Sequence, residues 1–487
     1  MPSWTNPSNG GLAMLSTLLV VIDGLRATDV PKMPFLAELA RCGVSYGQAR
    51  SVAPSLTRPA AASLATGAAP GATGIAGNRL WADGHPIDTG RPDHLELLRS
   101  LRGNRLLPVP TLGEHLADHG RKLVAVGTGS NGCTLLLNPG AVDGHGAVIG
   151  AHPSRHDAFY ARPESVRRRL AGNTPRAAGG QFPELDWATD LIVDYVMPEL
   201  APDVLVVWSG ELDEVQHSHG VDCPAGDDAL SAIDRRLRRL IDRVREQAPH
   251  TDVIVTADHG FSNATHALDV AEMTSQIPPP LSGDVQLVHN NGGLLVYPRR
   301  RLRTGEANAV LDAIMSAGWS GPTFADGGTV PGVLSLADLC SAQRADDGLL
   351  AYVSLTYYDR HGDIRVGHST QNGDTHLAGG HGSTSSADMR IPLVLNGPSC
   401  RTGHETQHPA DHLDIPATIC RLMGLPIPPS MSGRVLSEAS LRGAGNGSEP
   451  PKNRRVVAER SASDVTTAHF QEFSGRHYFL TAERHRT

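Results

Sequence analysis

The sequence predicts an α/β fold in which a mainly parallel sheet is sandwiched by helices, with an inserted cap region beside it. Short apolar runs without polar alternation, at residues 15–22 and 252–256, are typical of parallel strands that are buried on both faces. Segments with helical periodicity separate these runs, and strands alternating with helices indicate a sheet covered on both sides. Ligand sites in such sheets lie beyond the carboxyl ends of the strands. The search for functional residues therefore starts where predicted strands end.

The individual elements follow from apolar spacing and from the residues that stop a helix. Gly67 and Gly120 each end a predicted helix, because glycine readily takes the left-handed conformation that closes one. The expected elements are, in chain order, a strand at 15–22, helices at 33–41, 60–66 and 112–119, a strand at 122–126, a helix at 188–199, a strand at 204–208, a helix at 228–247 and a strand at 252–256.

Two stretches lack this periodicity and are rich in Gly, Pro, His and Arg: residues 81–110 and 138–183. We expect them to form a cap beside the sheet. Residues 443–454 have the composition of a polar linker, and residues 469–481 alternate like a small hairpin around Ser474-Gly475. The expected organisation is a first part of the catalytic core at 1–80, a cap region with some core elements at 81–183, a second part of the core at 184–440, and a linker with a C-terminal hairpin at 441–487.

Composition excludes several classes of protein. The chain has 487 residues and a formal net charge of −8, with no basic block of the kind that binds nucleic acid. Removing the three lysines Lys32, Lys122 and Lys452 from 43 basic residues leaves 40 arginines, a bias that runs through the whole chain. Aromatic residues make up only 4%, so stacking surfaces for a nucleic acid polymer are not expected.

The apolar run at residues 12–22 has only a superficial likeness to a signal peptide. No lysine or arginine precedes it, it lacks a small-residue cleavage site, and it ends at Asp23. It is also shorter than the roughly 20 residues that span a bilayer. The six cysteines are scattered without a CxxC pair, which argues against a disulfide-stapled secreted domain. We therefore expect a buried strand, no membrane partner and a cytoplasmic protein.

Acidic residues and histidines gather just beyond predicted strands or in a glycine-rich loop: Asp23, Asp213, His217, Asp258, His259 and His381. Taken singly, an aspartate after a strand is more often a helix cap, and an Asp-His pair arises easily among 23 histidines. Three aspartates and three histidines at strand ends of one sheet are instead expected to hold two divalent metal ions. Carboxylate with imidazole favours zinc, with manganese or iron as alternatives.

The candidate nucleophile is Thr57, in the sequence SVAPSLTRPAAASLATG. It precedes the alanine-rich helix at 60–66, whose first N–H groups and dipole form a natural phosphate site. A threonine hydroxyl is a weak nucleophile at neutral pH unless metal coordination lowers its pKa. The alternative interpretation is that Thr57 only caps the helix, and it would be preferred if no metal cluster accompanied the residue.

Together these residues, in this order, resemble the alkaline phosphatase superfamily, most closely its type I phosphodiesterase/nucleotide pyrophosphatase branch, with phosphonoacetate hydrolases nearby. The resemblance covers most of residues 15–90, 185–262 and 375–435. The segment at 412–436 is similar to the closing helix and loop of the superfamily. The resemblance implies an alkaline phosphatase-like core.

The resemblance also implies a role for each residue. One metal ion would be held by Asp213, His217 and His381, and the other by Asp23, Asp258 and His259, with Thr57 also coordinated. The segment PSLTRPAAA matches the nucleophile segment of the family and points to Thr57 rather than Ser55. Asn78, in GATGIAGN, matches an asparagine that would hydrogen-bond a non-bridging phosphoryl oxygen.

The sequence departs from the family at two candidate substrate-binding residues. The aromatic residue that usually follows the nucleophile is Arg58 here, which we expect to contact the substrate. Trp208 stands where another stacking aromatic of the branch would lie, and a tryptophan of the core is an equal alternative. The loop TGSNG at 128–132 is neutral where phosphonoacetate hydrolases carry a lysine, so it is not expected to bind a carboxylate.

These observations predict a two-metal hydrolase of phosphate diesters or nucleotide pyrophosphates that works through a covalent phosphothreonine intermediate. The expected partner is a small-molecule phosphate ester, with a nucleotide as one candidate, and the sequence leaves the oligomeric state open. Phosphonates and phosphomonoesters are alternative substrates within the superfamily. Residues 127–132 also match GxGxxG, but the CTLLLNPG that follows is short and runs into Asn138-Pro139, so no full helix is expected there and a nucleotide-cofactor protein is a remote alternative. A non-catalytic protein that only binds a phosphorylated ligand is another.

Overall fold

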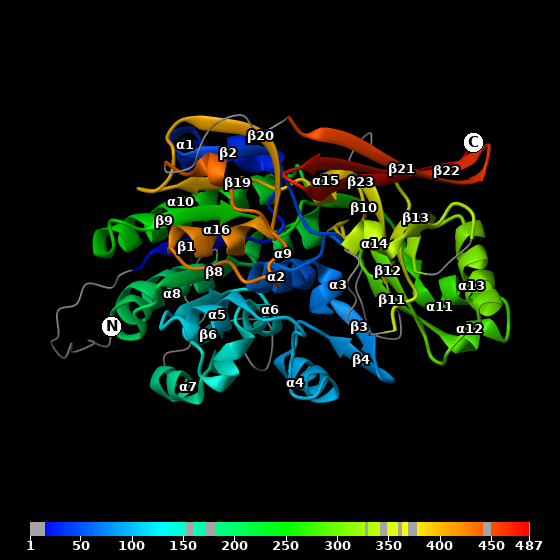
Figure 1. Cartoon of the computed structure of the whole chain (residues 1–487), viewed down its shortest axis with the longest axis horizontal. Helices are drawn as coiled ribbons and strands as arrows, with labels where there is room; N and C mark the ends of the chain where they lie inside the picture. Colours follow the sequence, from blue (N-terminus) through cyan, green and yellow to red (C-terminus); the bar gives the residue numbers. More distant parts are fainter. Residues whose placement is uncertain are drawn as a thin grey trace.

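The computed structural model describes residues 15–151, 159–171, 182–326, 330–340, 348–358, 363–368, 377–441 and 450–486. The largest sheet has nine strands: β1 (Thr17–Ile22), β2 (Val44–Arg50), β5 (Leu123–Gly127), β6 (Ala147–Ala151), β7 (Phe159–Arg162), β8 (Val204–Ser209), β9 (Asp252–Thr256), β19 (Leu393–Asn396) and β20 (His404–Asp411). Their order across the sheet is β20-β2-β19-β9-β1-β8-β5-β6-β7 (Figure 1).

Most neighbouring strands of this sheet run parallel. Strand β1 pairs in parallel with β8 on one side and β9 on the other, and β5 pairs in parallel with β6 and β8. Only β7 and β19 run antiparallel to their neighbours. The mainly parallel sheet predicted from the sequence is therefore confirmed, and the carboxyl ends of β9, β1 and β8 lie side by side at its centre.

Two groups of helices flank the sheet. One group packs around the long helix α10 (Pro224–Gln247), and the other packs around α2 (Thr57–Thr66). The first contains α1 (Pro34–Cys42) and α8 (Pro183–Leu191), and the second contains α5 (Leu112–Asp118), α6 (Asn131–Leu137) and α16 (Asp414–Leu422). The single helix expected at 188–199 is instead α8 followed by a π-helix, Ile192–Leu200, which contains Pro198.

The region expected to form a cap divides between the sheet and its surroundings. A hairpin of β3 (Arg79–Ala82) and β4 (His85–Asp88) and helix α4 (Pro92–Leu101) lie outside the large sheet. Strands β6 and β7, by contrast, extend that sheet at its edge, so this region also contributes strands to the core. The run Ala147–Ala151 is short and contains a glycine, which hides its buried strand from a search for periodicity. Parts of this region, 152–158 and 172–181, are outside the described residues.

A second sheet follows Asp258 and His259 in the chain, and the sequence analysis did not predict it. Its five strands are β11 (Val285–Asn290), β12 (Gly293–Pro298), β13 (Ser320–Ala325), β14 (Leu334–Ser335) and β15 (Ala351–Leu355). With helix α13 (Thr304–Ser316), this sheet has a hydrophobic core of its own around Met315 and Trp319 (at the right of Figure 1). The chain leaves the large sheet for this unit through β10 (Ser262–Asp269) and returns through β18 (Gly379–Gly380), which pairs with it.

The C-terminal segment forms a three-stranded antiparallel sheet of β21 (Lys452–Ser461), β22 (Asp464–Phe473) and β23 (Arg476–Arg486). The turn expected at Ser474-Gly475 is present, with positive φ angles of 51° and 74°; the third strand was not expected. Strand β23 contacts both β2 and β13, so this sheet joins the two larger sheets (red in Figure 1). The start of the expected linker, 443–449, lies outside the described residues. No helix in the described part of the chain is long and apolar enough to cross a membrane.

Candidate active site

The carboxyl ends of the three central strands each carry an aspartate. Asp23 directly follows β1, Asp258 follows β9 after one intervening residue, and Asp213 lies in α9 (Glu211–His219), which begins beyond β8. His217 lies one helical turn after Asp213, so the two side chains share a face of α9. His381 directly follows β18, where the chain returns from the second sheet. The parallel sheet thus gathers residues from distant parts of the sequence at one edge.

The first group of ligand atoms comes from Asp23, Asp258 and His259, and these atoms lie within 4.8 Å of one another. Nε2 of His259 is 3.0 Å from Oδ2 of Asp258 and 3.4 Å from Oδ1 of Asp23. All three residues are buried. These are the three residues that, with Thr57, the family resemblance assigns to one metal ion.

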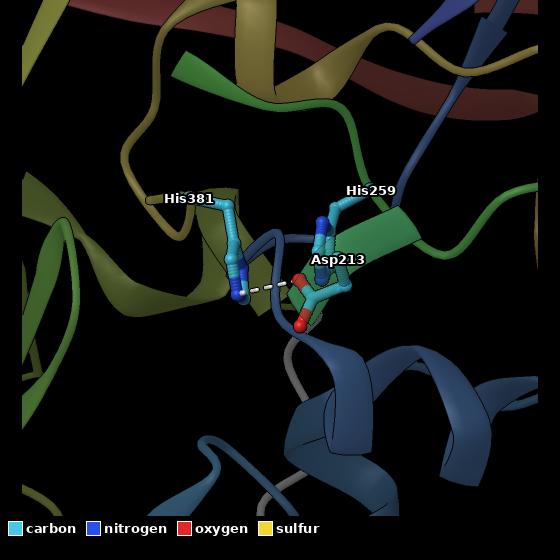
Figure 2. Close-up of side chains that lie close together, drawn as sticks. All are labelled: Asp213, His259 and His381. Atoms are coloured by element: carbon cyan, nitrogen blue, oxygen red, sulfur yellow. Dashed lines mark ion pairs between the residues drawn. The ribbon is translucent and has the colours of Figure 1, made fainter. Parts of the chain in front are cut away.

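The second group is formed by Asp213, His259 and His381, again with ligand atoms within 4.8 Å of one another. Figure 2 shows the two imidazoles beside each other and the ion pair between His381 and Asp213, whose atoms Nε2 and Oδ1 are 3.7 Å apart. The rings of His259 and His381 stack with centroids 3.5 Å apart. His217, expected in this group, lies beside it, with Nε2 3.4 Å from Oδ2 of Asp213.

The three histidines are oriented in the same way. Each presents Nδ1 to a backbone carbonyl: His217 to Gly379 at 2.9 Å, His259 to Gly260 at 2.9 Å and His381 to Ser55 at 3.1 Å. A carbonyl oxygen only accepts, so Nδ1 carries the proton and donates it, which leaves the lone pair on Nε2. Fixing the tautomer through the outer nitrogen in this way is typical of histidines that bind metals.

The carboxylates turn bare oxygens toward these nitrogens. Oδ1 of Asp23, Oδ1 of Asp213 and Oδ2 of Asp258 are buried, and none of them has a hydrogen-bond partner in the described part of the chain. Lone pairs therefore face lone pairs across the site, an arrangement that costs free energy unless a cation lies between them. The donor set of carboxylate oxygen and imidazole nitrogen fits zinc, manganese or iron.

Burial and crowding of like charges shift the pKa values of these groups. Burial, followed by the charges of Asp258 and Asp213, raises the pKa of Asp23 well above its usual range. Burial, followed by the neighbouring His259, holds the pKa of His381 well below its usual range. Burial would also raise the pKa of Asp258, but the neighbouring His259 and the backbone N–H of Gly24 lower it overall. Such opposed shifts are characteristic of functional sites.

Thr57 is the first residue of α2 and is buried beside this cluster. Its hydroxyl Oγ1 lies 3.3 Å from Nε2 of His259. The next backbone N–H, that of Arg58, donates to Oδ1 of Asn78 at 3.0 Å, which fixes the asparagine next to the hydroxyl. The structure therefore brings Thr57, Arg58 and Asn78 together, as the sequence analysis expected of a nucleophile and its phosphate-binding neighbours.

The Arg58 guanidinium is held by the GxGxxG-like loop. Its Nη2 donates to Oγ of Ser130 at 2.9 Å, and Ser130 also caps α6 through Cys133 N–H. Helix α6 begins at Asn131, inside this loop, and has only seven residues. Gly132 is required by packing, because a Cβ there would lie 2.2 Å from the carbonyl oxygen of Thr89. The loop serves to position Arg58.

Trp208 does not lie in the position, expected from the sequence, where its ring would stack on a substrate. Its side chain is only 1% exposed, and its indole N–H donates to Oδ2 of Asp23 at 3.0 Å. A buried ring offers no face to a nucleobase, so the stacking interpretation is wrong and the alternative of a core tryptophan holds. Trp208 orients a candidate metal ligand from behind.

Asn291 is a site residue that the sequence analysis missed. It lies in the tight turn between β11 and β12, with a φ of +52°, and its Nδ2 is 3.4 Å from Nε2 of His381. The neighbouring Asn290 instead brackets Arg79, accepting from its N–H at 2.8 Å and donating to its carbonyl at 3.1 Å. The Asn291-Gly292 pair is a recognisable hairpin signal, but a turn signal does not reveal where the turn will lie.

Beyond Asn78 the β3–β4 hairpin and β11 enclose a cleft of about 870 Å³. Its polar and aromatic lining includes Arg79, Trp81, Arg91, His94, His289 and Arg299. The guanidinium of Arg299 lies over the Trp81 ring, 5.1 Å from its centroid. The cleft is therefore a cationic and aromatic surface that begins one residue from Asn78.

Comparison with known proteins agrees with this geometry. Residues 17–325 match the model of the family "Type I phosphodiesterase / nucleotide pyrophosphatase". The chain belongs to this family. The family match includes Thr57, Asn78 and every metal-ligand candidate except His381, which follows the second sheet.

Solved structures support the same fold. Murine ectonucleotide pyrophosphatase/phosphodiesterase 5, as an inactive threonine-to-alanine variant in complex with AMP, superimposes with a TM-score of 0.61 at 17% identity, covering 85% of this chain and 96% of that chain. The human protein gives a TM-score of 0.59 at 16% identity over the same shares. At this identity the likeness establishes the fold.

A curated relative matches over a shorter stretch. The 2,3-bisphosphoglycerate-independent phosphoglycerate mutase of Halobacterium salinarum is 32% identical over 115 residues, or 21% of this chain and 22% of that protein. The chain thus matches about a fifth of the length of this relative.

Proposed function

We propose that this member of the family is a metal-dependent hydrolase of phosphate diesters, including nucleotide pyrophosphates, that forms a covalent phosphothreonine on Thr57. One observation carries the proposal. Buried carboxylate oxygens and imidazole nitrogens face one another without donors between them, next to a threonine hydroxyl at the start of a helix. That arrangement suits two cations and a phosphoryl group.

Two sites for divalent ions can be assigned to the residues present. Asp23, Asp258 and His259 would hold one ion, and Asp213 and His381 with His217 would hold the other. When bound, these ions supply Lewis-acid charge that lowers the pKa of a hydroxyl group and neutralises phosphoryl oxygens. Zinc is the proposed metal because aspartate and histidine are its ordinary ligands, with manganese and iron as alternatives.

The proposed reaction has two steps at Thr57. Its Oγ1 loses a proton and forms a bond to phosphorus, while the bond from phosphorus to the leaving oxygen breaks and that oxygen takes up a proton. Water then attacks the phosphothreonine, which releases a phosphate monoester and restores the hydroxyl. The threonine-to-alanine variant of murine ectonucleotide pyrophosphatase/phosphodiesterase 5 is inactive, which supports a nucleophilic threonine.

Residues on two sides of Thr57 would stabilise charge on the phosphoryl oxygens. The carbonyl oxygen of the Asn78 side chain accepts from the Arg58 backbone, so its NH₂ group is the part that remains to donate. Arg58 belongs to the first turn of α2, and Ser130 holds its guanidinium. Donors fixed in advance at the site of developing charge are the usual source of such stabilisation.

The cleft beyond Asn78 supports a nucleotide as the substrate. Trp81 offers an aromatic ring in place of the buried Trp208, and Arg79 and Arg299 offer positive charge for a second phosphate. The AMP bound to the murine protein of the same fold is consistent with this class of ligand. Diesters are proposed over monoesters because the cluster provides for two metal ions and no third group of carboxylates accompanies it among the described residues.

The deciding experiment compares kcat/KM for an aryl phosphate monoester and a matched aryl alkyl diester. The proposal requires a preference for the diester. A tenfold preference for the monoester, equal to about 1.4 kcal/mol of differential transition-state binding, would contradict the substrate class but not the phosphothreonine. Rapid-quench trapping of phosphate on Thr57 tests the intermediate separately.

A further inference from the structure

A cavity of about 350 Å³ lies away from the candidate metal cluster, where the C-terminal sheet meets the end of β2. It is lined by Arg50, the last residue of β2, and by residues 51–53, which follow it. Asp338 and Leu339 of α14 (Leu336–Cys340) line another side, and residues 475–479, at the turn before β23 and in its first residues, line a third. In Figure 1 the red C-terminal strands run over this side of the molecule. The cavity is also lined by Ala69, Pro70, Asp411, Leu413, Ser432 and Phe470, so it lies between several separate parts of the chain.

Arg50 lines this cavity and is only 7% exposed. Its Nη1 donates to the carbonyl of Ala49 and its Nη2 to the side-chain oxygen of Gln48, each at 3.0 Å, and both acceptors are neutral. Its Nε has no hydrogen-bond partner within the described ranges. Arginine is rarely buried without a carboxylate partner, because a desolvated charge needs an opposite charge beside it.

The surroundings of Arg50 make its buried positive charge still less favourable without a negative partner. Arg390 pairs with it across an isolated β-bridge, and burial together with the charge of Arg390 lowers the pKa of Arg50 to about 10. Asp338 also lines the cavity, yet among the described carboxylates none makes an ion pair with Arg50. The other arginine of the cavity is the half-buried Arg476, which is neutralised by Asp411, at 3.0 Å, and by Asp414; Asp411 also lines the cavity.

We infer that this cavity binds a small oxyanion, namely a phosphate group. Arg50 would bind the phosphate oxygens through the guanidinium N–H groups that do not donate to Ala49 or Gln48. The planar guanidinium offers five donors in a fork that matches two phosphate oxygens, and two neutral acceptors leave most of the fork unused. The volume of about 350 Å³ accommodates either free phosphate or a small phosphate ester.

The site is connected to the metal cluster through the residues that follow Arg50. The hydroxyl of Ser51 donates to the carbonyl oxygen of Asp258 at 2.6 Å. The backbone N–H of Val52 donates to Nδ1 of His412 at 3.3 Å, and Nε2 of that ring donates to the carbonyl of Ala257 at 2.7 Å. An anion on Arg50 therefore stabilises the segment that supports the Asp258 loop.

The test counts phosphate ions bound per chain by equilibrium dialysis of the purified metal-containing protein at fixed ionic strength. We expect the wild-type protein and the matched control Arg390→Gln to bind one phosphate more per chain than Arg50→Gln. In phosphate-free chloride buffer Arg50→Gln should also melt at a higher temperature than wild type, by about 2 °C or more, because a buried charge has been removed. Equal stoichiometry of wild type and Arg50→Gln would overturn the proposal.

A second measurement uses wild-type protein alone, so that a variant that does not fold cannot obscure the result. Crystals grown with phosphate should show density for the ion against Arg50, and an empty cavity at saturating phosphate would overturn the proposal.

Glycerol 2-phosphate distinguishes a free phosphate ion from the phosphate group of a larger molecule. It is added to the Thr57→Ala protein so that it is not consumed. Binding of inorganic phosphate alone assigns a free anion, and binding of both assigns the phosphate group of a larger molecule.

Discussion

Nε2 of His259 lies 3.3 Å from Oγ1 of Thr57. Nδ1 of the same ring donates to the carbonyl of Gly260, so the lone pair of Nε2 is directed at the hydroxyl and at Asp258. Thr57 itself is not a helix cap, because Leu56 is the N-cap residue of α2 and no side chain caps that end. The contact thus links the candidate nucleophile to the candidate metal cluster, and it removes the main alternative to a chemical role.

We expect Thr57→Ala to reduce turnover of an aryl alkyl phosphate diester by at least about a thousandfold, as the loss of a nucleophile does in other covalent hydrolases. The fold should persist because one exchanged side chain leaves the α2 backbone and its Arg58–Asn78 contact in place. Thr57→Ser should retain part of the activity, since the hydroxyl survives. Circular dichroism and metal analysis serve as controls; near-wild-type rates in Thr57→Ala would make water the nucleophile.

The purified chain should contain close to two divalent ions, mainly zinc, measured by inductively coupled plasma mass spectrometry. Asp258→Asn should deplete the site shared with Asp23, and His217→Ala should deplete the site shared with Asp213. Removal of both ions by a chelator should lower the melting temperature, because ligands that bind only the folded state stabilise it. A metal-free protein that gains neither stability nor activity from added zinc or manganese would refute the assignment.

The aspartates of the site could be predicted because the rule for parallel sheets depends only on where strands end. Asp23, Asp213 and Asp258 each follow an apolar run that the sequence makes obvious. The order of strands was not predictable, since pairing of β1 with both β8 and β9 joins segments more than 180 residues apart. The sharing of His259 between both ligand groups follows from that order and was therefore missed as well.

Two errors in the site have different physical causes. Trp208 ends an apolar strand, and the sequence alone does not distinguish a side chain that turns inward from one at the rim; its hydrogen bond to Asp23 decides the question. Asn291 belongs to the second sheet, whose position beside His381 depends on the return of the chain through β18. Long-range packing of this kind leaves no local periodicity to find.

Asn291 provides a prediction that separates a role in the site from a role in folding. Asn291→Ala should lower kcat/KM for the diester by about 10–100-fold, the order expected when a group that contacts a metal ligand is lost, with little change in melting temperature. Asn290→Ala is the matched control, because it breaks the two bonds that bracket Arg79. That variant should lose about 1–3 kcal/mol of unfolding free energy. The reverse pattern would place Asn290 rather than Asn291 in the site.

Arg58 should favour substrates that carry a second negative charge. Arg58→Ala is expected to reduce kcat/KM by about tenfold for a substrate with a second negative charge and by less for a neutral-tailed diester, because a guanidinium contact to an anion is lost. Ser130→Ala leaves the charge in place and removes one bond that orients it, so its effect should be smaller. Equal losses for both substrates in Arg58→Ala would show that the residue supports the α2 helix start and does not discriminate between substrates.

Trp208→Phe tests whether the tryptophan orients Asp23 or binds a nucleobase. Phenylalanine keeps an aromatic ring but removes the indole N–H that donates to Oδ2 of Asp23. If Trp208 orients the ligand, metal affinity at the Asp23 site should fall by about 10–100-fold while KM for a nucleotide diester stays unchanged at saturating metal. Trp81→Ala provides the contrast, because this ring lines the cleft under Arg299. It should raise KM for the nucleotide diester and leave metal affinity intact, since Trp81 makes no contact with a ligand residue among the described side chains.

The opposite result for Trp208→Phe would be unchanged metal affinity together with a raised KM for the nucleotide diester. That result would mean that Trp208 stacks on the nucleobase after all, and that its ring leaves its buried position when the substrate binds.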